Sequence, residues 1–539
     1  MHGDPAYPHF DLNKTAQVYP VLPALIAWGA AVHHGRDLLV QDDDRLTYGD
    51  AAARSAVLAA RLLAHGIGKG ARVGMLLPNG ADFIVTWFAI ARIGATAVPI
   101  STLSSGPELA RILRSCGCPL LIATDRYLRT DFRERIEAAL DLADAVAPIA
   151  VAAAPHLRAI WLWQGEASWA VPVHGVPAVA AELVVQAEQM VTPADPISII
   201  YTSGSTSDPK GVIHSHGNFM RSSQRWAASM PYRDGDRLFA NSPMFWVGGL
   251  ITSLLTLMQV GGALIGTSRQ GSSLLDVIER EQCTTLQVWP YLARAIVDDA
   301  SFSARDFSAM RAGSVLGMID PAQWPRNGNQ FGFAMGMTET AGPHCCAMHE
   351  IDDAHLGAMG LLAPGMEHRI VDAETGAVLP EGASGVLHVR GNTLMLGYVG
   401  REPGDVFDAD GWFDTGDICS IRDLHIFFHG RRDMMIKTAG ANVAPAEVEL
   451  ALHAVEGVAE AHVLGVADPV RGQIVGAIIV PKAGCVLHVD QVLGEARRLL
   501  SSYKVPRRLL IMEAPPTTAT NKLDRRVATR MLENAPVVG

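Results

Sequence analysis

The segment at residues 201–212 has the residue types of a phosphate-binding loop. It reads YTSGSTSDPKGV and follows an apolar run at residues 197–200. Gly204 leaves the backbone unobstructed and permits positive φ, and the hydroxyl and N–H groups around it can face one anion. Lys210 adds a mobile positive charge suited to phosphate oxygens. The segment is not a Walker A loop, because it lacks GK followed by Ser or Thr, and its composition alone fits a plain linker equally well.

Three later segments carry charged residues in turn-like settings. GMTE at residues 336–339 ends in a carboxylate, and GWFDTGD at residues 411–417 ends in another. A carboxylate at Asp417 suits a vicinal diol because it offers two acceptor oxygens. Lys522 lies in PTTATNKLDR, residues 516–525. Taken singly, each segment is also compatible with an ordinary solvated turn.

In this order, the segments resemble the motifs of the adenylate-forming superfamily, which includes acyl-CoA synthetases, luciferases and nonribosomal adenylation domains. The phosphate loop is similar to TSGTTGxPKG, with Ser205 and Ser207 replacing Thr and Gly. GMTE resembles YGxTE, and GWFDTGD resembles the GWxxTGD motif. Residues 430–449 resemble the GRxD…PxEIE junction, and residues 516–525 resemble PxTxxGKxxR with Asn521 replacing Gly. The resemblance covers nearly the whole chain.

The resemblance implies a role for each matching residue. The ATP-binding residues would be Thr202, Ser203, Gly204, Ser205, Thr206, Lys210, Met335, Gly336, Met337, Thr338, Asp417 and Arg431. The catalytic residues would be Lys522, Glu339, Thr206 and Lys210, with Glu339 holding Mg²⁺. Asp433 would be the hinge, and the coenzyme A path would include Gly440, Ala441 and Asn442.

The residues that border the acyl pocket have a weaker sequence signature than those that bind ATP. Residues 242–249, SPMFWVGG, resemble a PxFHxxG segment with Trp246 in the His position. The predicted pocket residues are Trp246, Val247, Gly248, Gly313 and Met335. No Asp stands in this window to pair an α-amine, and the large side chains favour an apolar acid. Met and aromatic residues are, however, more often core packing than pocket lining.

Alternating helix and strand patterns predict a layered α/β architecture. Helices are expected at residues 50–65, 82–93, 108–115, 274–280, 291–297, 446–453 and 489–500. Strands are expected at residues 73–77, 95–100, 120–123, 284–288, 424–428, 459–466 and 474–480. Residues 151–181, rich in Ala, Pro and Val, suggest a surface excursion. We expect a large multi-sheet N-terminal domain, residues 1–430, and a small α+β C-terminal domain, residues 431–539, joined by a short hinge.

Composition narrows the class of protein. The chain has 539 residues, 49% hydrophobic and 18% charged, with a net charge of −11. The chain has no clustered run of Lys and Arg, which a nucleic-acid-binding surface would need. The seven scattered cysteines suit a reducing cytoplasm, and the N-terminus lacks the pattern of a signal peptide. The apolar stretch at residues 249–266 contains polar residues and a Gly–Gly break, which favours a buried helix and turn over a membrane span.

The implied activity is ATP-dependent ligation of an apolar carboxylic acid, fatty, aromatic or otherwise bulky, to coenzyme A through an acyl-adenylate. ATP and coenzyme A would be co-substrates, with Mg²⁺ as the cofactor. A homodimer is compatible with this reading. The alternatives are an acyl-AMP ligase that loads a carrier protein, a catalytically inactive binding homologue, and a luciferase-type oxygenase.

Overall fold

The computed structural model describes residues 19–202, 209–319, 329–330, 334–346, 353–438, 441–469, 471–500, 504–518 and 522–538. The chain forms two compact units. Unit 1 comprises Met1–Glu367 and Arg390–Gly411, and unit 2 comprises His368–Val389 and Trp412–Gly539. The predicted boundary at residues 430–431 stays a prediction.

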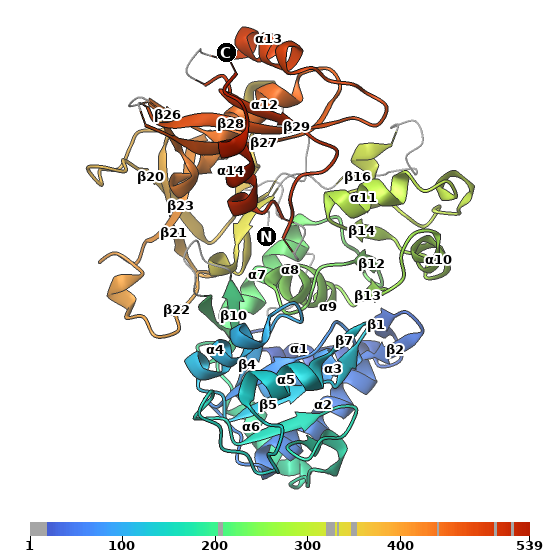
Figure 1. Cartoon of the computed structure of the whole chain (residues 1–539). Helices are drawn as coiled ribbons and strands as arrows, with labels where there is room; N and C mark the ends of the chain where they lie inside the picture. Colours follow the sequence, from blue (N-terminus) through green and yellow to red (C-terminus); the bar gives the residue numbers. More distant parts are fainter. Residues whose placement is uncertain are drawn as a thin grey trace. The chain divides into compact units, whose positions relative to one another are not determined.

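Unit 1 contains an eight-stranded sheet in the order β22-β11-β10-β4-β3-β5-β8-β9; its strands β22, β10, β4 and β5 are labelled in Figure 1. Its strands are β3 (Arg72–Leu76), β4 (Thr96–Pro99), β5 (Leu120–Ala123), β8 (Ala159–Leu162), β9 (Val171–Pro172), β10 (Pro196–Thr202), β11 (Lys210–Ser215) and β22 (Gly397–Tyr398). The strands from β10 to β9 in this order are parallel, whereas β11 runs antiparallel to both β10 and β22. The antiparallel end of the sheet therefore begins where the predicted phosphate loop connects β10 to β11.

A second sheet of unit 1 has the order β16-β15-β14-β12-β13-β1-β2. Its strands are β1 (Asp37–Gln41), β2 (Asp44–Thr47), β12 (Arg237–Ala240), β13 (Ala263–Gly266), β14 (Thr285–Gln287), β15 (Ala312–Gly313) and β16 (Asn329–Gln330). All pairs are parallel except β1 with β2. Parallel strands expose their carboxyl ends at a shared edge, where ligands of α/β proteins commonly bind.

Helices of unit 1 cover and join the two sheets. They are α1 (Leu22–His33), α2 (Tyr48–Ala64), α3 (Ala81–Arg92), α4 (Gly106–Cys116), α5 (Phe132–Leu140), α6 (Ala181–Gln189), α7 (His216–Ser229), α8 (Val247–Gly249), a π-helical turn η3 (Leu250–Leu255), α9 (Thr256–Met258), α10 (Ser272–Arg280) and α11 (Pro290–Val297). The largest hydrophobic cluster contains Leu38 and Val73 from the two sheets, Trp87 of α3 and Phe219 of α7. Helices α3 and α7 are buried on most sides, as expected for helices inside a layered core.

The predicted elements agree with the structure in type and differ by one or a few residues at their ends. Strand β5 has the predicted bounds, and α2, α3, α4, α10 and α11 each lie at a predicted helix. The surface excursion predicted at residues 151–181 is wrong at Ala159–Leu162, whose side chains are buried within β8. A strand covered on both faces is apolar throughout and shows no alternation, so its period could not be recognised between alanine- and proline-rich flanks.

Unit 1 also holds three short antiparallel strands, β17 (Ala334–Met337), β18 (Gly342–Cys346) and β19 (Leu361–Leu362). Unit 2 has one group of strands, in the order β24-β23-β21-β20, and a second sheet in the order β26-β25-β28-β27 with β29 beside β28. They are β20 (Met366–Val371), β21 (Gly385–Gly391), β23 (Phe413–Arg422), β24 (His425–Arg431), β25 (Ile436–Thr438), β26 (Ala441–Val443), β27 (Val458–Asp468), β28 (Gly472–Pro481) and β29 (Arg508–Ile511).

The helices of unit 2 are α12 (Pro445–His453), α13 (Val489–Leu499) and α14 (Arg525–Asn534). A separate hydrophobic cluster includes Val448 of α12, Val463 of β27 and Leu493 of α13, so this unit has a core of its own. The predicted α/β class, with a large N-terminal part and a smaller C-terminal part, is confirmed. Within the described residues, every helix is too short or too polar to span a bilayer.

Candidate functional site

The predicted phosphate loop leaves β10 at Thr202 and returns at Lys210. These two residues face each other in the antiparallel register of β10 and β11, so the loop is the connection of a hairpin. The predicted residues Ser203, Gly204, Ser205 and Thr206 lie outside the described residues. At the end of β10, the Tyr201 hydroxyl lies 2.5 Å from Ser115 Oγ. The two ends of the loop are therefore held by the sheet and by α4.

Glu339 lies in unit 1 beside the strand that carries Lys210. Its side chain is 8% exposed, and Tyr398 Oη donates a hydrogen bond of 2.7 Å to its Oε1 atom. Lys210 Nζ lies 5.6 Å from the centroid of the same tyrosine ring, within cation–π range. Tyr398 is placed there because β22 pairs with β11, with Val212 opposite Tyr398. A carboxylate and an ammonium group are thus brought to one aromatic side chain.

Thr338 precedes Glu339 in a short 3₁₀ turn. Its carbonyl oxygen lies 2.7 Å from His214 Nε2, and because a carbonyl can only accept, Nε2 carries the proton. His214 is fully buried on β11, and burial lowers its pKa to about 4. The imidazole is therefore neutral near pH 7. The backbone of Glu339 is held as well, because Met395 N–H donates to the Glu339 carbonyl at 2.7 Å.

The other predicted residues of this turn lie on β17. Met335 is 9% exposed. A Cβ atom at Gly336 would lie 2.5 Å from Gly342 O and 2.5 Å from Pro343 Cα. Because both neighbours are backbone atoms, only glycine permits this approach of β17 to β18. Met337 follows, half-buried, and leads into the turn.

Unit 2 carries Asp417 and Arg431, two of the residues predicted to bind ATP. Asp417, on β23, is 7% exposed, and Arg431 Nη1, on the paired strand β24, donates to its Oδ1 atom at 2.9 Å. The Asp417 N–H donates to Thr415 Oγ1 at 3.1 Å, which fixes the turn before the carboxylate. The structure therefore brings two predicted ATP-binding residues together as an ion pair.

The remaining predicted residues of unit 2 lie in a segment near the carboxyl terminus, in a 3₁₀ turn and in a short strand. Lys522 is exposed, and its carbonyl accepts a hydrogen bond of 2.7 Å from the Thr518 N–H. Asp433 lies in the 3₁₀ turn Arg432–Met434. Of the predicted coenzyme A residues, Ala441 and Asn442 lie in β26, whereas Gly440 lies outside the described residues.

The segment predicted to border the acyl pocket follows the carboxyl end of β12. Trp246 is half-buried, and its ring meets that of Phe245 edge to face, with centroids 5.2 Å apart. The Asn79 amide holds the segment: it donates to Ser242 O at 3.1 Å and accepts from Met244 N at 2.7 Å. Of the other predicted pocket residues, Val247 and Gly248 begin the helical segment and Gly313 ends β15.

Polar side chains that the sequence did not single out adjoin this segment. The Gly248 carbonyl accepts from Thr252 Oγ1 at 2.7 Å. Gln287 is the last residue of β14, and its Nε2 atom lies 3.5 Å from Thr252 Oγ1. Its Oε1 atom accepts a hydrogen bond of 3.3 Å from the buried Tyr232 hydroxyl. The carboxyl edge of the second sheet therefore contains a polar relay as well as apolar residues.

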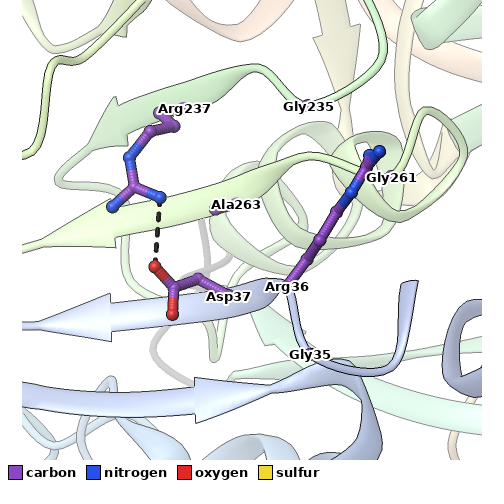
Figure 2. Close-up of a pocket in the computed structure, with 7 residues that line it drawn as sticks. All are labelled: Gly35, Arg36, Asp37, Gly235, Arg237, Gly261 and Ala263. Atoms are coloured by element: carbon purple, nitrogen blue, oxygen red, sulfur yellow. Dashed lines mark hydrogen bonds and ion pairs between the residues drawn. The ribbon is translucent and has the colours of Figure 1, made fainter.

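A separate cavity of about 340 Å³ lies at the opposite edge of the same sheet. It is lined by Gly35, Arg36, Asp37, Gly235, Arg237, Gly261 and Ala263, at the amino ends of β1, β12 and β13 (Figure 2). Its two arginines are already paired, Arg36 with Asp234 at 2.6 Å and Arg237 with Asp37 at 3.1 Å. This cavity contains none of the predicted site residues.

Sequence reasoning also missed the roles of Tyr398 and His214. Tyr398 follows Gly391 and Gly397 in a segment whose glycines and aromatic residue indicate core packing rather than a binding site. His214 lies two residues beyond the Pro-Lys-Gly-Val motif and carries no motif of its own. Only the pairing of β11 with β22, which spans almost two hundred residues, brings Tyr398 to Glu339.

Comparison with known families covers most of the chain. Residues 26–399 match the family model described as AMP-binding enzyme, and residues 447–522 match the model described as AMP-binding enzyme C-terminal domain. A feruloyl-CoA synthase of Amycolatopsis is 30% identical over 524 residues, which are 95% of this chain and 98% of that relative. A mitochondrial medium-chain acyl-CoA ligase of Danio rerio is 26% identical, over 95% of this chain and 86% of that protein.

Solved structures show the same fold. An anthranilate CoA ligase in complex with anthranoyl-AMP matches with a TM-score of 0.78 and 24% identity, over 96% of this chain and 98% of that chain. A fatty acyl CoA synthetase of Mycobacterium tuberculosis matches with a TM-score of 0.68 and 25% identity, over 95% and 98%. The comparisons confirm the predicted superfamily and the predicted class of AMP-forming ligase. Since the first family model spans well over half of the residues, the chain belongs to the family of AMP-binding enzymes.

Proposed function

We propose that the chain is an ATP-dependent ligase that converts a bulky apolar carboxylic acid to its acyl-CoA through an acyl-adenylate. The observation that carries the proposal is the Tyr398 side chain, which contacts both the Glu339 carboxylate and the Lys210 ammonium where the β10–β11 hairpin returns. A buried carboxylate beside a lysine at a hydroxyl-rich loop suits a polyphosphate substrate with its counter-ion.

In the first half-reaction, a carboxylate oxygen of the acid attacks the α-phosphorus of ATP, and pyrophosphate leaves. The protein's contribution to phosphoryl-type transfer is positioning and charge neutralisation. Lys210 would offset the charge of the phosphates, Thr338 would donate to the α-phosphate, and Asp417 would accept hydrogen bonds from the ribose hydroxyls. Lys522 would bridge the acid and the α-phosphate.

Glu339 fits a Mg²⁺ site. Magnesium is commonly held by one or two carboxylates together with substrate phosphates and water, and a single buried carboxylate with one oxygen held by Tyr398 meets that requirement. Bound there, Mg²⁺ would supply positive charge to the phosphate oxygens. The described residues contain no cluster of three or more His, Cys, Asp or Glu side chains for a metal ion, so the phosphates themselves would complete the ligand set.

In the second half-reaction, the thiol sulfur of coenzyme A attacks the acyl carbonyl carbon, the acyl–oxygen bond of the anhydride breaks, and AMP leaves. The leaving group is already activated, so the protein mainly orients the thiol and excludes water. We assign Gly440, Ala441 and Asn442 to the coenzyme A path and Asp433 to a hinge that lets unit 2 serve both half-reactions. All seven cysteines are free thiols, which suits the cytoplasmic location included in the proposal.

The proposed substrate class is an aromatic or medium-chain acid. Met244 and Phe245 are buried and Trp246 is half-buried beside the carboxyl edge of the second sheet. Two relatives named for feruloyl-CoA and for medium-chain acyl-CoA formation support the same range. The polar relay through Thr252 and Gln287 favours acids that carry a hydroxyl or oxo group away from the carboxylate, since an apolar wall would leave such a group unpaired.

A panel of acids tests this proposal. We expect pyrophosphate release with hydroxycinnamic, other arylcarboxylic and C6–C12 fatty acids, and little with free amino acids. With coenzyme A present, the same acids should yield acyl-CoA and AMP, measured by liquid chromatography. Pyrophosphate release followed by transfer to a carrier protein but not to coenzyme A would instead identify an acyl-AMP ligase, and no release with any acid would indicate an inactive homologue.

The Asp417→Asn substitution tests the ribose assignment. A charge-assisted hydrogen bond contributes about 1.5–3 kcal/mol, so we expect the KM for ATP to rise roughly 10- to 100-fold with a smaller effect on kcat. Asp468→Asn is the matched control, because Asp468 accepts from the Arg471 N–H at the end of β27 in the same unit. An unchanged KM for ATP in Asp417→Asn would remove this residue from the ATP site.

A further inference from the structure

The turn that carries Thr338 and Glu339 is fastened from outside by two elements of the eight-stranded sheet. Strand β11 supplies His214, whose Nε2 donates to the Thr338 carbonyl at 2.7 Å. The segment that ends in β22 supplies Met395 N–H to the Glu339 carbonyl, also at 2.7 Å, and Tyr398 Oη to Glu339 Oε1 at 2.7 Å. Two consecutive backbone carbonyls and one carboxylate oxygen are therefore held together.

We propose that Tyr398 and His214 are positioning residues, which hold the Glu339 carboxylate at a fixed place relative to Lys210 so that it binds the metal of a metal–ATP complex. This inference rests on the proposed function of Glu339. Neither residue is assigned contact with substrate: each acts through a group of the turn. We name the three contacts of His214, Met395 and Tyr398 the turn clamp.

Tyr398 is suited to this role because it reaches both charged groups. Its hydroxyl group holds one oxygen of the carboxylate, and its ring faces Lys210 Nζ at 5.6 Å from the centroid. The phenol donates its hydrogen to Glu339 Oε1, and a carboxylate has a second oxygen that can accept a hydrogen bond or bind a metal. Hydrogen-bond partners of metal-binding carboxylates orient them, and their loss commonly weakens metal binding.

His214 fixes the backbone side of the same turn. The Thr338 carbonyl also accepts from Ala341 N–H at 3.0 Å, and Ala341 has a left-handed φ of 57° that closes the turn. A non-glycine residue in this conformation is uncommon and is kept only where its surroundings enforce it. The His214 hydrogen bond, made from a fully buried side chain, is one such enforcing contact.

Tyr398→Phe removes the hydroxyl group and leaves the ring beside Lys210. The test measures, by calorimetry, the affinity for α,β-methylene-ATP across a range of Mg²⁺ concentrations and in EDTA. We expect the Mg²⁺-dependent part of binding to weaken about tenfold and binding in EDTA to stay unchanged. Tyr48→Phe, which removes an equally short hydrogen bond to Gly262 O at 2.7 Å elsewhere in unit 1, should change neither.

The Glu339→Gln variant separates this inference from the proposed function. We expect it to weaken the Mg²⁺-dependent part of binding, and we expect Tyr398→Phe to add nothing further in its background. If Glu339→Gln leaves the Mg²⁺ dependence intact, the metal assignment of Glu339 fails. If Glu339→Gln weakens it and Tyr398→Phe does not, or if Tyr398→Phe weakens binding equally in EDTA, the positioning role alone is overturned.

His214 is tested by loss and rescue of its donor. His214→Leu removes the hydrogen bond to Thr338, whereas His214→Gln offers an amide N–H in its place. We expect pyrophosphate release to fall about tenfold in the leucine variant with the KM for the acid unchanged, and to recover at least partly with glutamine. Equal losses in both variants, or a loss confined to the KM for the acid, would contradict a positioning role.

Discussion

Lys522→Ala is expected to lower the rate of acyl-adenylate formation by roughly 100- to 1,000-fold, the usual cost of removing a group that stabilises developing charge. The proposed role of Lys522 is to bridge the acid and the α-phosphate, which matters only while the phosphorus is attacked. Coenzyme A attack on a supplied acyl-adenylate should therefore proceed at close to its original rate. Pyrophosphate release and thioester formation from synthetic acyl-adenylate measure the two steps separately.

The fold around Lys522 should tolerate this change. Thr518 holds the Lys522 backbone, because its N–H donates to the Lys522 carbonyl and its side-chain Oγ1 accepts from the Lys522 N–H at 3.3 Å. The lysine side chain is exposed. Lys482→Ala, which alters another exposed lysine of unit 2, is the matched control. Equal losses in both half-reactions would show that Lys522 does not act in adenylation specifically.

Acidification is expected to destabilise unit 1 between pH 6.5 and pH 4. His214 and His216 are fully buried, and desolvation lowers the pKa of each to about 4. A histidine whose pKa is lowered in the folded state adds stability above its unfolded pKa of about 6.5 and loses it as the pH falls toward the folded value. At pH 5 each histidine should cost about 2 kcal/mol, which is a large fraction of the stability of a domain.

The hydrogen bonds explain why neither ring accepts a second proton easily. His216 Nδ1 accepts from the Leu22 N–H at 3.2 Å, so protonation would remove that bond. His214 Nδ1 is buried, and the described residues offer it no acceptor. Urea unfolding followed by tryptophan fluorescence at pH 7.5 and pH 5 would measure the effect. His214→Leu should remove about half of the pH dependence, whereas His156→Gln, at an exposed position, should leave it in place; the same pH dependence in both would refute the assignment.

The sequence predicts those parts of the site whose chemistry lies within one short segment. Asp417 and Lys522 could be found because their motifs are contiguous, and local hydrogen bonds to Thr415 and Thr518 hold their backbones. Most helices were predicted for a similar reason, since periodicity is a local property. The ends of these helices differ by a few residues because they depend on side-chain caps, such as the capping box of Ser105 and Glu108 before α4.

Features that depend on distant pairing could not be predicted. Gly397 and Gly400 near Tyr398 indicate packing, and only the pairing of Tyr398 with Val212 brings its hydroxyl group to Glu339. The relay from Tyr232 through Gln287 to Thr252 likewise joins residues from three separate segments of the chain. Strand β8 was missed because its burial on both faces removes the alternation on which a strand prediction rests.

The pairing of β22 with β11 has a further consequence, for the folding of truncated chains. A chain that ended before Gly397 would present β11 as an unprotected sheet edge, with the buried Val212 at its centre. Exposed apolar edges pair readily with other chains and promote aggregation. Because this contact joins residues far apart in the sequence, it is also expected to form late, after much of the chain has been synthesised. Shortened versions of unit 1 intended for crystallisation should therefore retain residues through Tyr398.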